Sequence, residues 1–315
     1  MKKINVILPV YNESEVIESF NNELQNVIKL LNSKYEFQVI YVLDKSRDGT
    51  IEILRDIAKQ YTNVKVIALS RRFGHQMSLV AGMHQCDGEA VIMMDCDLEH
   101  PPIIIKELLE KFEEGFDIVQ TKRIYNEKIS FFKKTGSRLF YKLLSKLSSV
   151  PISSDSADFR LISKRVVTVF KKDITEQNQF LRGLFPWVGF NQTNITFISE
   201  SRKKGKSKYN LKRLINFATM GIIAFSKIPL KFSVYIGLTI SILSIFYGLY
   251  TILSFFISKN IPEGWTSVIA TVSFLGGIQL IFMGIIGEYI GGIFDEVKNR
   301  PLYIIEEEFE GVKNE

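Results

Sequence analysis

Apolar and polar residues follow two different periods along the first two thirds of the chain. Short apolar runs rich in β-branched residues are typical of buried strands, and apolar positions three and four apart are typical of amphipathic helices. The runs predict strands over Ile4–Val10, Gln38–Leu43, Val64–Leu69, Ala90–Met94 and Asp117–Thr121. The helical spacing predicts helices over Glu15–Leu31, Ile51–Tyr61 and Ile103–Phe112. Strands that alternate with helices indicate an α/β domain with a mainly parallel sheet covered on both faces.

The last third of the chain has a different pattern. No charged residue occurs between Phe232 and Ile257, or between Trp265 and Gly287. A helix needs about 20 apolar residues to cross a bilayer, so each run is long enough to span. A short linker joins the runs, which predicts an antiparallel transmembrane hairpin over 232–290. The alternative is a pair of buried core helices.

Basic residues are concentrated on one side of this hairpin. Nine of them precede the first run, and the linker offers Lys259. The positive-inside rule therefore places a domain over 1–209 and a tail over 291–315 in the cytoplasm. Between them, residues 210–231 have apolar positions at helical spacing and predict interfacial amphipathic helices lying on the membrane. A globular core helix is the alternative for this segment.

The charge balance and the cysteine count narrow the function. The net charge is +6, which fits nucleic acid, a membrane surface or a phosphorylated ligand. The basic residues are concentrated before the hairpin, which favours anionic membrane lipid as their partner. No nucleic-acid-binding motif occurs, so we expect no nucleic-acid partner. Two cysteines cannot form a disulfide framework, which fits a reducing compartment.

Polar clusters follow three of the predicted strands. They lie over 9–13, 44–50 and 95–102. Because the carboxyl ends of parallel strands share one edge of a sheet, these clusters are expected to converge on a ligand site. The pair Asp95 and Asp97 is the sharpest feature, since residues two apart on an extended segment point the same way. Two carboxylates suit Mg²⁺ or Mn²⁺, ions that are often shared with a diphosphate; a solvated acidic turn is the alternative.

The strand-end clusters, the segment Asp158-Phe159-Arg160-Leu161, the basic segment 202–209 and the two apolar runs together resemble glycosyltransferase family 2. The chain is similar in particular to polyprenyl-phosphate glycosyltransferases, relatives of dolichyl-phosphate mannose synthase. This resemblance implies a GT-A fold, a Rossmann-like α/β domain that uses a nucleotide-diphosphate sugar and a divalent metal. The implied nucleotide-sugar residues are Pro9, Tyr11, Asn12, Glu13, Asp44, Asp95, Arg202 and Lys206. The implied metal ligands are Asp95, Asp97 and Glu99.

One segment departs from the family pattern. The family often has Asp-Asp-Gly-Ser where this chain has Leu43-Asp44-Lys45-Ser46. The first carboxylate and the glycine are missing, so base recognition is left open between uridine and guanosine. We expect a UDP-sugar rather than GDP-mannose. For Arg202 and Lys206, a lipid-headgroup patch is the alternative to a role at the donor diphosphate.

The resemblance also implies an acceptor site. Arg123, Arg138 and Arg182 are carried over as acceptor-phosphate residues, with snorkelling and surface arginines as the alternatives for Arg138 and Arg182. Asp158 is the candidate catalytic base or acceptor-orienting carboxylate, and Asp155 is the alternative to it. Asp97 is the other residue of the catalytic set.

Gly74 and Gly82 are interpreted as turn or packing glycines.

The expected activity is therefore inverting transfer of one sugar from a nucleotide sugar to polyprenyl phosphate, with undecaprenyl phosphate favoured. The expected place is a bacterial inner membrane, crossed more than once, with the catalytic domain in the cytoplasm. A homo-oligomer is left open. The rival interpretations are a transferase of the same fold that acts on a growing polysaccharide, and a non-catalytic membrane scaffold.

Overall fold

The computed structural model describes residues 1–97, 99–125, 156–199, 226–258 and 264–311. Four residues with an expected role, Arg138, Asp155, Arg202 and Lys206, lie outside the described residues. Most of the expected interfacial segment lies outside them as well, and its end, 228–231, forms the first turn of a long helix.

Eight strands of the described residues form one sheet in the order β7-β5-β6-β4-β1-β2-β3-β8. Their bounds are β1 Lys2–Val10, β2 Tyr35–Leu43, β3 Val64–Leu69, β4 Ala90–Met93, β5 Ile118–Tyr125, β6 Ser156–Ser163, β7 Gln192–Ser199 and β8 Ile305–Glu310. The pairs β1–β2, β1–β4, β2–β3 and β5–β7 are parallel, whereas β6 runs antiparallel to β4 and β5, and β8 to β3. The mainly parallel α/β sheet predicted from the sequence is confirmed.

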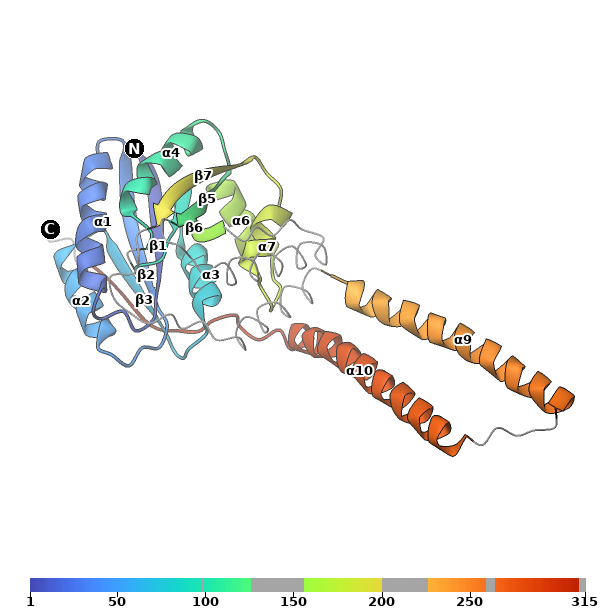
Figure 1. Ribbon diagram of the computed structural model, residues 1–315. Helices are drawn as coiled ribbons and strands as arrows, with labels where there is room; N and C mark the ends of the chain where they lie inside the picture. Colours follow the sequence, from blue (N-terminus) through green and yellow to red (C-terminus); the bar gives the residue numbers. More distant parts are fainter. Residues whose placement is uncertain (98, 126–155, 200–225, 259–263, 312–315) are drawn as a thin grey trace.

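Helices cover both faces of the sheet (Figure 1). One face carries α1 (Ile17–Leu31), α2 (Thr50–Gln60) and α4 (Ile105–Glu113), which follows the short 3₁₀ turn η1 (Pro102–Ile104). The other face carries α3 (His75–Gln85), α6 (Lys164–Lys172) and α7 (Leu181–Trp187). Because both faces are covered, the central strands are continuous apolar runs rather than alternating ones.

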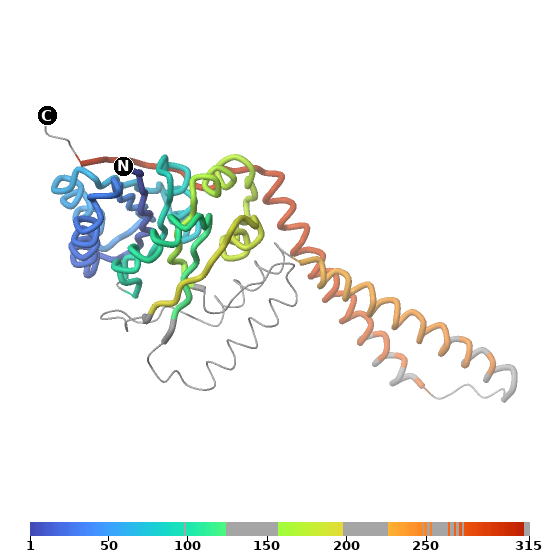
Figure 2. The backbone as a smooth tube through the Cα atoms, turned by 90° about the horizontal axis from the view of Figure 1, so that it is seen from above, coloured from blue at the N-terminus to red at the C-terminus, as the bar shows by residue number. Residues whose placement is uncertain are grey.

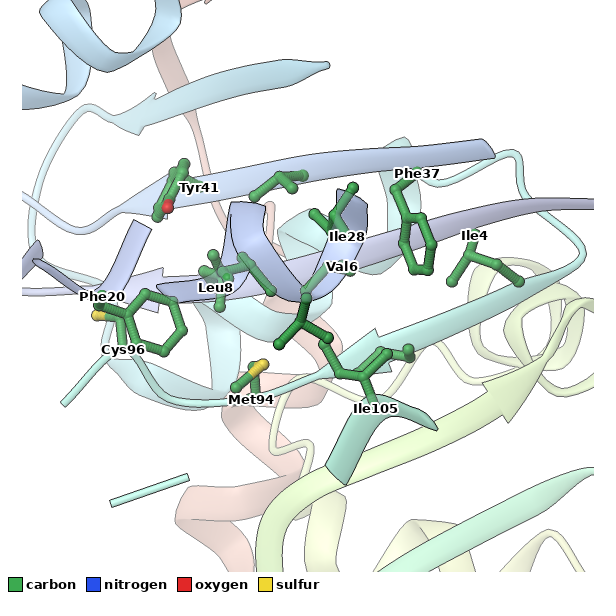
Figure 3. Close-up of a cluster of buried hydrophobic side chains, with 14 of the residues drawn as sticks. Ile4, Val6, Leu8, Phe20, Ile28, Phe37, Tyr41, Met94, Cys96 and Ile105 are labelled. Atoms are coloured by element: carbon green, nitrogen blue, oxygen red, sulfur yellow. The ribbon is translucent and has the colours of Figure 1, made fainter. Parts of the chain in front are cut away.

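The core divides into two layers by the alternation of side chains along each strand. Figure 3 shows the layer between β1 and α1, where Val6 and Leu8 meet Phe20 and Ile28. Ile7, between Val6 and Leu8, belongs to the opposite layer and packs against α3. A Cβ at Gly82 of α3 would overlap the side chain of Ile7, so a larger residue would force Ile7 or the helix to move, which confirms the packing role expected for this glycine.

Two long helices, α9 (Ile228–Ser258) and α10 (Trp265–Lys298), extend away from the sheet domain (Figure 1). Each is long and apolar enough to cross a membrane, and neither candidate span is buried within the protein. α10 continues past the charge-free run to Lys298, since charged residues do not end a helix.

The chain returns to the sheet after α10 (Figure 2). β8 pairs with β3, and Phe309 of β8 packs against the core layer that lies between β1 and α1. Ion pairs join β8 to the domain, including Lys45 with Glu306 and Arg55 with Glu307. The sequence did not predict this strand, because three consecutive glutamates in it obscure the alternation of its exposed and half-buried positions.

Candidate active site

The carboxyl ends of β1, β2 and β4 meet at one edge of the sheet, called here the rim. β1 lies between β2 and β4, so the direction of the crossovers reverses there. Open α/β sheets bind ligands outside the strand ends at such a switch point. β6 runs antiparallel to β4 and begins at the same edge, with Arg160 opposite Met93. The reversal brings Asp158 to the rim.

Hydrogen bonds join the loops that follow β1 and β2. The N–H of Asn12 donates to the Ser46 hydroxyl (3.0 Å), and the side-chain oxygen of Asn12 accepts from the N–H of Arg47 (3.0 Å). Asn12 has a φ of 53°, a left-handed conformation that asparagine tolerates better than most residues. The N–H of Glu13 donates to the Thr50 hydroxyl (3.2 Å). The expected nucleotide-sugar residues Asn12 and Glu13 therefore lie beside the end of β2.

Asp44 is buried at the end of β2 and binds the loop that follows β3. Its Oδ1 accepts from the N–H of Phe73 (2.8 Å), and its Oδ2 accepts from the N–H of Gly74 (2.9 Å). This places a carboxylate at the N-terminal end of α3, where a negative charge is favourable. Gly74 has a φ of +96°, which favours glycine and confirms its expected turn role. Asp44 thus fixes the β3–α3 loop with both of its oxygens.

The same loop covers Tyr11. The guanidinium carbon of Arg72 lies 4.0 Å from the centre of the Tyr11 ring, which is a cation–π contact. Pro9 lies further back in β1, paired with Val42 of β2. The expected nucleoside residues are therefore gathered at neighbouring strand ends, and their role in binding stays a prediction.

Asp95 follows β4 and contacts two histidines. Its Oδ1 lies 2.7 Å from Nε2 of His75, the first residue of α3, and its N–H donates to Nδ1 of His100 (2.9 Å). Although burial favours its neutral form, the charge of His75 lowers the pKa of Asp95 to about 2. Burial opposes the charge of His75 too, but Asp95 raises the pKa of that imidazole to about 9. The two side chains form a charged pair at neutral pH.

Asp97 and Glu99 complete the turn after β4. Cys96 points into the core, with its Sγ 3.6 Å from the carbonyl oxygen of Pro9. Asp95 and Asp97, on either side of it, are therefore directed away from the core. Asp97 Oδ1 accepts from the N–H of Glu99 (3.1 Å), and Glu99 Oε2 accepts from Nη1 of Arg123 (2.6 Å).

These carboxylates have the chemistry that a divalent cation requires. Oxygen ligands suit Mg²⁺ and Mn²⁺, and such ions are commonly held by one or two carboxylates together with substrate phosphates. Within the described ranges, no three His, Cys, Asp or Glu side chains converge closely enough to hold an ion by themselves. The residues fit a cation that these carboxylates share with a diphosphate, and Asp95, Asp97 and Glu99 stay the predicted ligands; Asp95 also pairs with His75, and Glu99 with Arg123.

Asp158 binds two arginines. Arg182 donates from Nε to Oδ1 (3.1 Å) and from Nη2 to Oδ2 (2.8 Å), and Arg160 donates to Oδ1 (3.0 Å). Burial would raise the pKa of Asp158, but the charges of Arg182 and Arg160 hold it well below its usual range. Arg160 is 2% exposed, and burial lowers its pKa to about 10, so it stays charged at neutral pH. Arg182 is not the isolated surface arginine of the alternative interpretation.

The loop that precedes α7 contacts the end of α10. The N–H of Gln177 donates to Oε2 of Glu296 (2.9 Å), and the Gln177 side chain donates to Asn299 (3.4 Å). Gln177 precedes α7, whose Leu181 N–H donates to the Gln76 side chain of α3 (3.1 Å). The apolar helices and the rim are thus connected through the segment that carries Arg182.

A doubly wound sheet with carboxylates at its switch point, followed by two apolar helices, defines a GT-A glycosyltransferase with a C-terminal helical hairpin. The comparisons agree with this class. Residues 5–170 match the family model described as Glycosyl transferase family 2, and residues 228–293 match the GtrB C-terminal hairpin. The chain belongs to glycosyl transferase family 2.

Similar proteins match over nearly the whole chain. A Bacillus subtilis relative named as the glycosyltransferase YkcC is 38% identical over 310 residues, covering 98% of this chain and 95% of the relative. The bactoprenol glucosyl transferase of Shigella phage SfII is 37% identical over 309 residues, covering 98% and 99%. A solved glucosyl-3-phosphoglycerate synthase from Mycobacterium tuberculosis, in complex with Mn²⁺ and UDP, has a TM-score of 0.45 at 20% identity, covering 70% of this chain and 76% of that one.

Four further residues lie around the rim without a role predicted from the sequence: Arg72, His75, His100 and Arg160. Polar residues that follow parallel strands gather at one edge of a sheet. Applied to the end of β3, this rule would have predicted Arg72 and His75 as site residues. Arg160 could also have been predicted from the sequence, because it stands two residues from Asp158 on one strand, and residues two apart on a strand share a face.

Proposed function

We propose that this enzyme transfers one sugar from a nucleotide-diphosphate sugar to polyprenyl phosphate at the cytoplasmic face of a bacterial inner membrane. The observation that carries the proposal is the contact of Gln177, in the loop before α7, with Glu296 of α10, because α7 also carries Arg182 to the rim. We propose that a lipid-linked phosphate reaches the rim past this end of α10. The relatives named bactoprenol glucosyl transferases support a polyprenol acceptor.

The donor half of the site is proposed at the ends of β1, β2 and β4. Tyr11, under Arg72, and the joined loops around Asn12 and Glu13 would hold the nucleoside. Both oxygens of Asp44 already accept hydrogen bonds from the β3–α3 loop. We therefore propose that Asp44 holds this loop in place beside the nucleoside and does not contact the base. A UDP-sugar remains the favoured donor over GDP-mannose.

A divalent cation would be held by Asp95 and Asp97 with the donor diphosphate. Bound there, it would neutralise the charge that develops on the leaving nucleoside diphosphate. His75 and the segment around Arg202 and Lys206 are proposed to add positive charge on the same side. Either Mg²⁺ or Mn²⁺ satisfies this chemistry.

The acceptor half is proposed around Arg123 and Arg182, with Arg138 as a further arginine. Arginine forks bind phosphate oxygens well, and Arg182 is held in a fixed orientation by Asp158. A phosphate oxygen of the acceptor would attack the anomeric carbon from the face opposite the diphosphate. The new carbon–oxygen bond forms as the old one breaks, the diphosphate leaves with the electron pair, and the configuration inverts.

Strong base help is not needed in this step. The second pKa of a phosphate monoester is about 6, so the acceptor is largely a dianion at neutral pH. Asp158, whose oxygens accept from two arginines, is better suited to orienting those arginines than to removing a proton. We therefore assign it the acceptor-orienting role.

The proposal is tested by a screen of nucleotide sugars. Purified enzyme in detergent is incubated with undecaprenyl phosphate, Mg²⁺ or Mn²⁺, and each of several UDP- and GDP-sugars. We expect one donor class to yield a lipid whose mass exceeds that of undecaprenyl phosphate by one sugar residue. A parallel incubation replaces undecaprenyl phosphate with a polysaccharide, and sugar transfer in that incubation alone would favour the rival acceptor.

A further inference from the structure

His100 is a buried histidine at the centre of the site to which the proposed function gives no part. Its side chain is 0% exposed. The ring stacks on Phe159, with centroids 5.2 Å apart, and meets Phe197 edge-on at 5.8 Å. Phe159 lies between Asp158 and Arg160 in β6. The imidazole is therefore held in one plane, and only its two nitrogens remain to interact.

Each ring nitrogen faces a group that can only donate. The N–H of Asp95 lies 2.9 Å from Nδ1, and Nη2 of Arg123 lies 2.9 Å from Nε2. A neutral imidazole has one unprotonated nitrogen, so it can accept one of these two hydrogen bonds at a time. When Nδ1 carries the hydrogen, the ring can accept from Arg123 at Nε2 but no longer from the N–H of Asp95, and Oδ2 of Asp95 lies 3.7 Å from Nδ1, beyond hydrogen-bond distance. The two contacts therefore compete for one lone pair.

The competing groups belong to opposite halves of the site. Asp95 begins the turn proposed to hold the cation and the donor diphosphate. Arg123 is the proposed acceptor-phosphate arginine, and it also binds Glu99 at the end of the same turn. A change in the partner of His100 thus alters the donor turn and the acceptor arginine together.

We propose that His100 is a positioning residue that couples donor binding to acceptor binding. An anionic acceptor that attracts Arg123 leaves the ring free to accept from the N–H of Asp95, which tightens the donor turn. The nucleotide then binds more strongly when the acceptor phosphate is present. This inference rests on the proposed function for the identity of the two ligands.

Two substitutions separate the two contacts. In His100→Asn the side-chain oxygen can take the place of Nδ1 but does not reach Arg123. In His100→Gln it can take the place of Nε2 but leaves the N–H of Asp95. Neither side chain can alternate between the partners as the imidazole does. His84→Asn, at a histidine of α3 that contacts Tyr303, is the matched control.

The test measures nucleotide affinity by titration calorimetry with and without farnesyl phosphate, a short polyprenyl phosphate, in the presence of Mg²⁺. UDP and GDP are both used as probes, since neither turns over. We expect the wild type and His84→Asn to bind the nucleotide at least threefold more tightly when farnesyl phosphate is present. Both His100 variants are expected to bind it without that gain. The KM for polyprenyl phosphate should rise in His100→Gln, whose oxygen stays on Arg123 and competes with the acceptor, and should not rise in His100→Asn, which leaves Arg123 to the acceptor.

Two results would contradict this role. One is a gain in the His100 variants equal to that of the wild type; the other is no gain in a wild type that binds nucleotide and forms the lipid product. In both cases the proposed function stands and the role of His100 fails. If the wild type binds neither UDP nor GDP and forms no lipid-linked sugar, the proposed function fails and the coupling fails with it.

Discussion

Asp158 and Arg182 form a two-pronged ion pair at the rim, with contacts of 3.1 and 2.8 Å. The carboxylate is on β6 and the guanidinium on α7, so the pair fixes α7 to the sheet next to the end of α10. Arg160 approaches the same carboxylate from within β6 at 3.0 Å. A carboxylate bound in this way holds its proton weakly, which is the opposite of what a general base at neutral pH requires.

Asp158→Asn should destabilise the protein by about 3–5 kcal/mol, since it leaves two arginines without their counter-charge at a site that is only partly open to solvent. The folded-state pKa of Asp158 lies below its ordinary value of 3.8. The stabilisation by the ionised carboxylate is therefore fully present above pH 3.8 and is lost as the pH falls below it. Melting temperatures of the detergent-solubilised wild type and variant should differ by a constant amount from pH 8 to pH 5.

The matched control for this series is Asp56→Asn, at an exposed carboxylate that pairs with Lys59. It should melt within experimental error of the wild type at every pH. A difference for Asp158→Asn that already shrinks between pH 8 and pH 6 would mean that the carboxyl titrates there. Asp158 would then be suited to act as the base.

Asp44→Asn should weaken the binding of UDP and GDP by the same factor, about tenfold, because it disturbs the β3–α3 loop and the Arg72 contact with Tyr11. Loss of one charge-assisted hydrogen bond to a backbone N–H corresponds to about 1.5 kcal/mol, which is close to that factor. Calorimetry with each nucleotide measures the effect. A changed ratio between the two nucleotides would show that Asp44 contacts the base itself.

Much of the fold was predictable because its central strands are buried on both faces. The run Val64–Leu69 became β3 with the same bounds, and the polar clusters after three strands did reach one edge. β6 was not predicted, because Asp158 and Arg160 interrupt its apolar pattern. Asp158 is paired with Arg160 and with Arg182 of α7, and a hydropathy pattern does not contain such pairings.

The site was less predictable than the fold for a related reason. Asp44 was expected at the nucleoside, but its two oxygens bind backbone groups of a loop far along the chain. Glu99 and Arg123 were given separate roles at the metal and the acceptor, and they form an ion pair with each other. Which polar groups neutralise one another depends on distances between strand ends that spacing along the chain does not fix.

The proposed membrane topology can be checked by cysteine labelling. The native Cys86 and Cys96 are both buried, so they should give little background with a membrane-impermeant maleimide. Cysteine at position 260 should be labelled from outside intact cells, and cysteine at the exposed Glu310 only after permeabilisation. Labelling of both positions from the same side would contradict the hairpin.

The metal proposal predicts that Asp97→Ala abolishes sugar transfer, since it removes a proposed ligand on the rim. EDTA should inactivate the wild type, and excess Mg²⁺ or Mn²⁺ should restore its activity. Asp56→Asn should behave as the wild type in the same assay. Full activity of the wild type in EDTA would remove the cation from the reaction.

The central claim is that the acceptor is a polyprenyl phosphate. The most direct measurement compares release of nucleoside diphosphate from the active donor with undecaprenyl phosphate, with undecaprenol, and with no lipid, while mass spectrometry follows the lipid. Release that requires undecaprenyl phosphate and equals the lipid-linked sugar formed, mole for mole, is the predicted result. Release at the same rate with undecaprenol or without lipid would contradict the account.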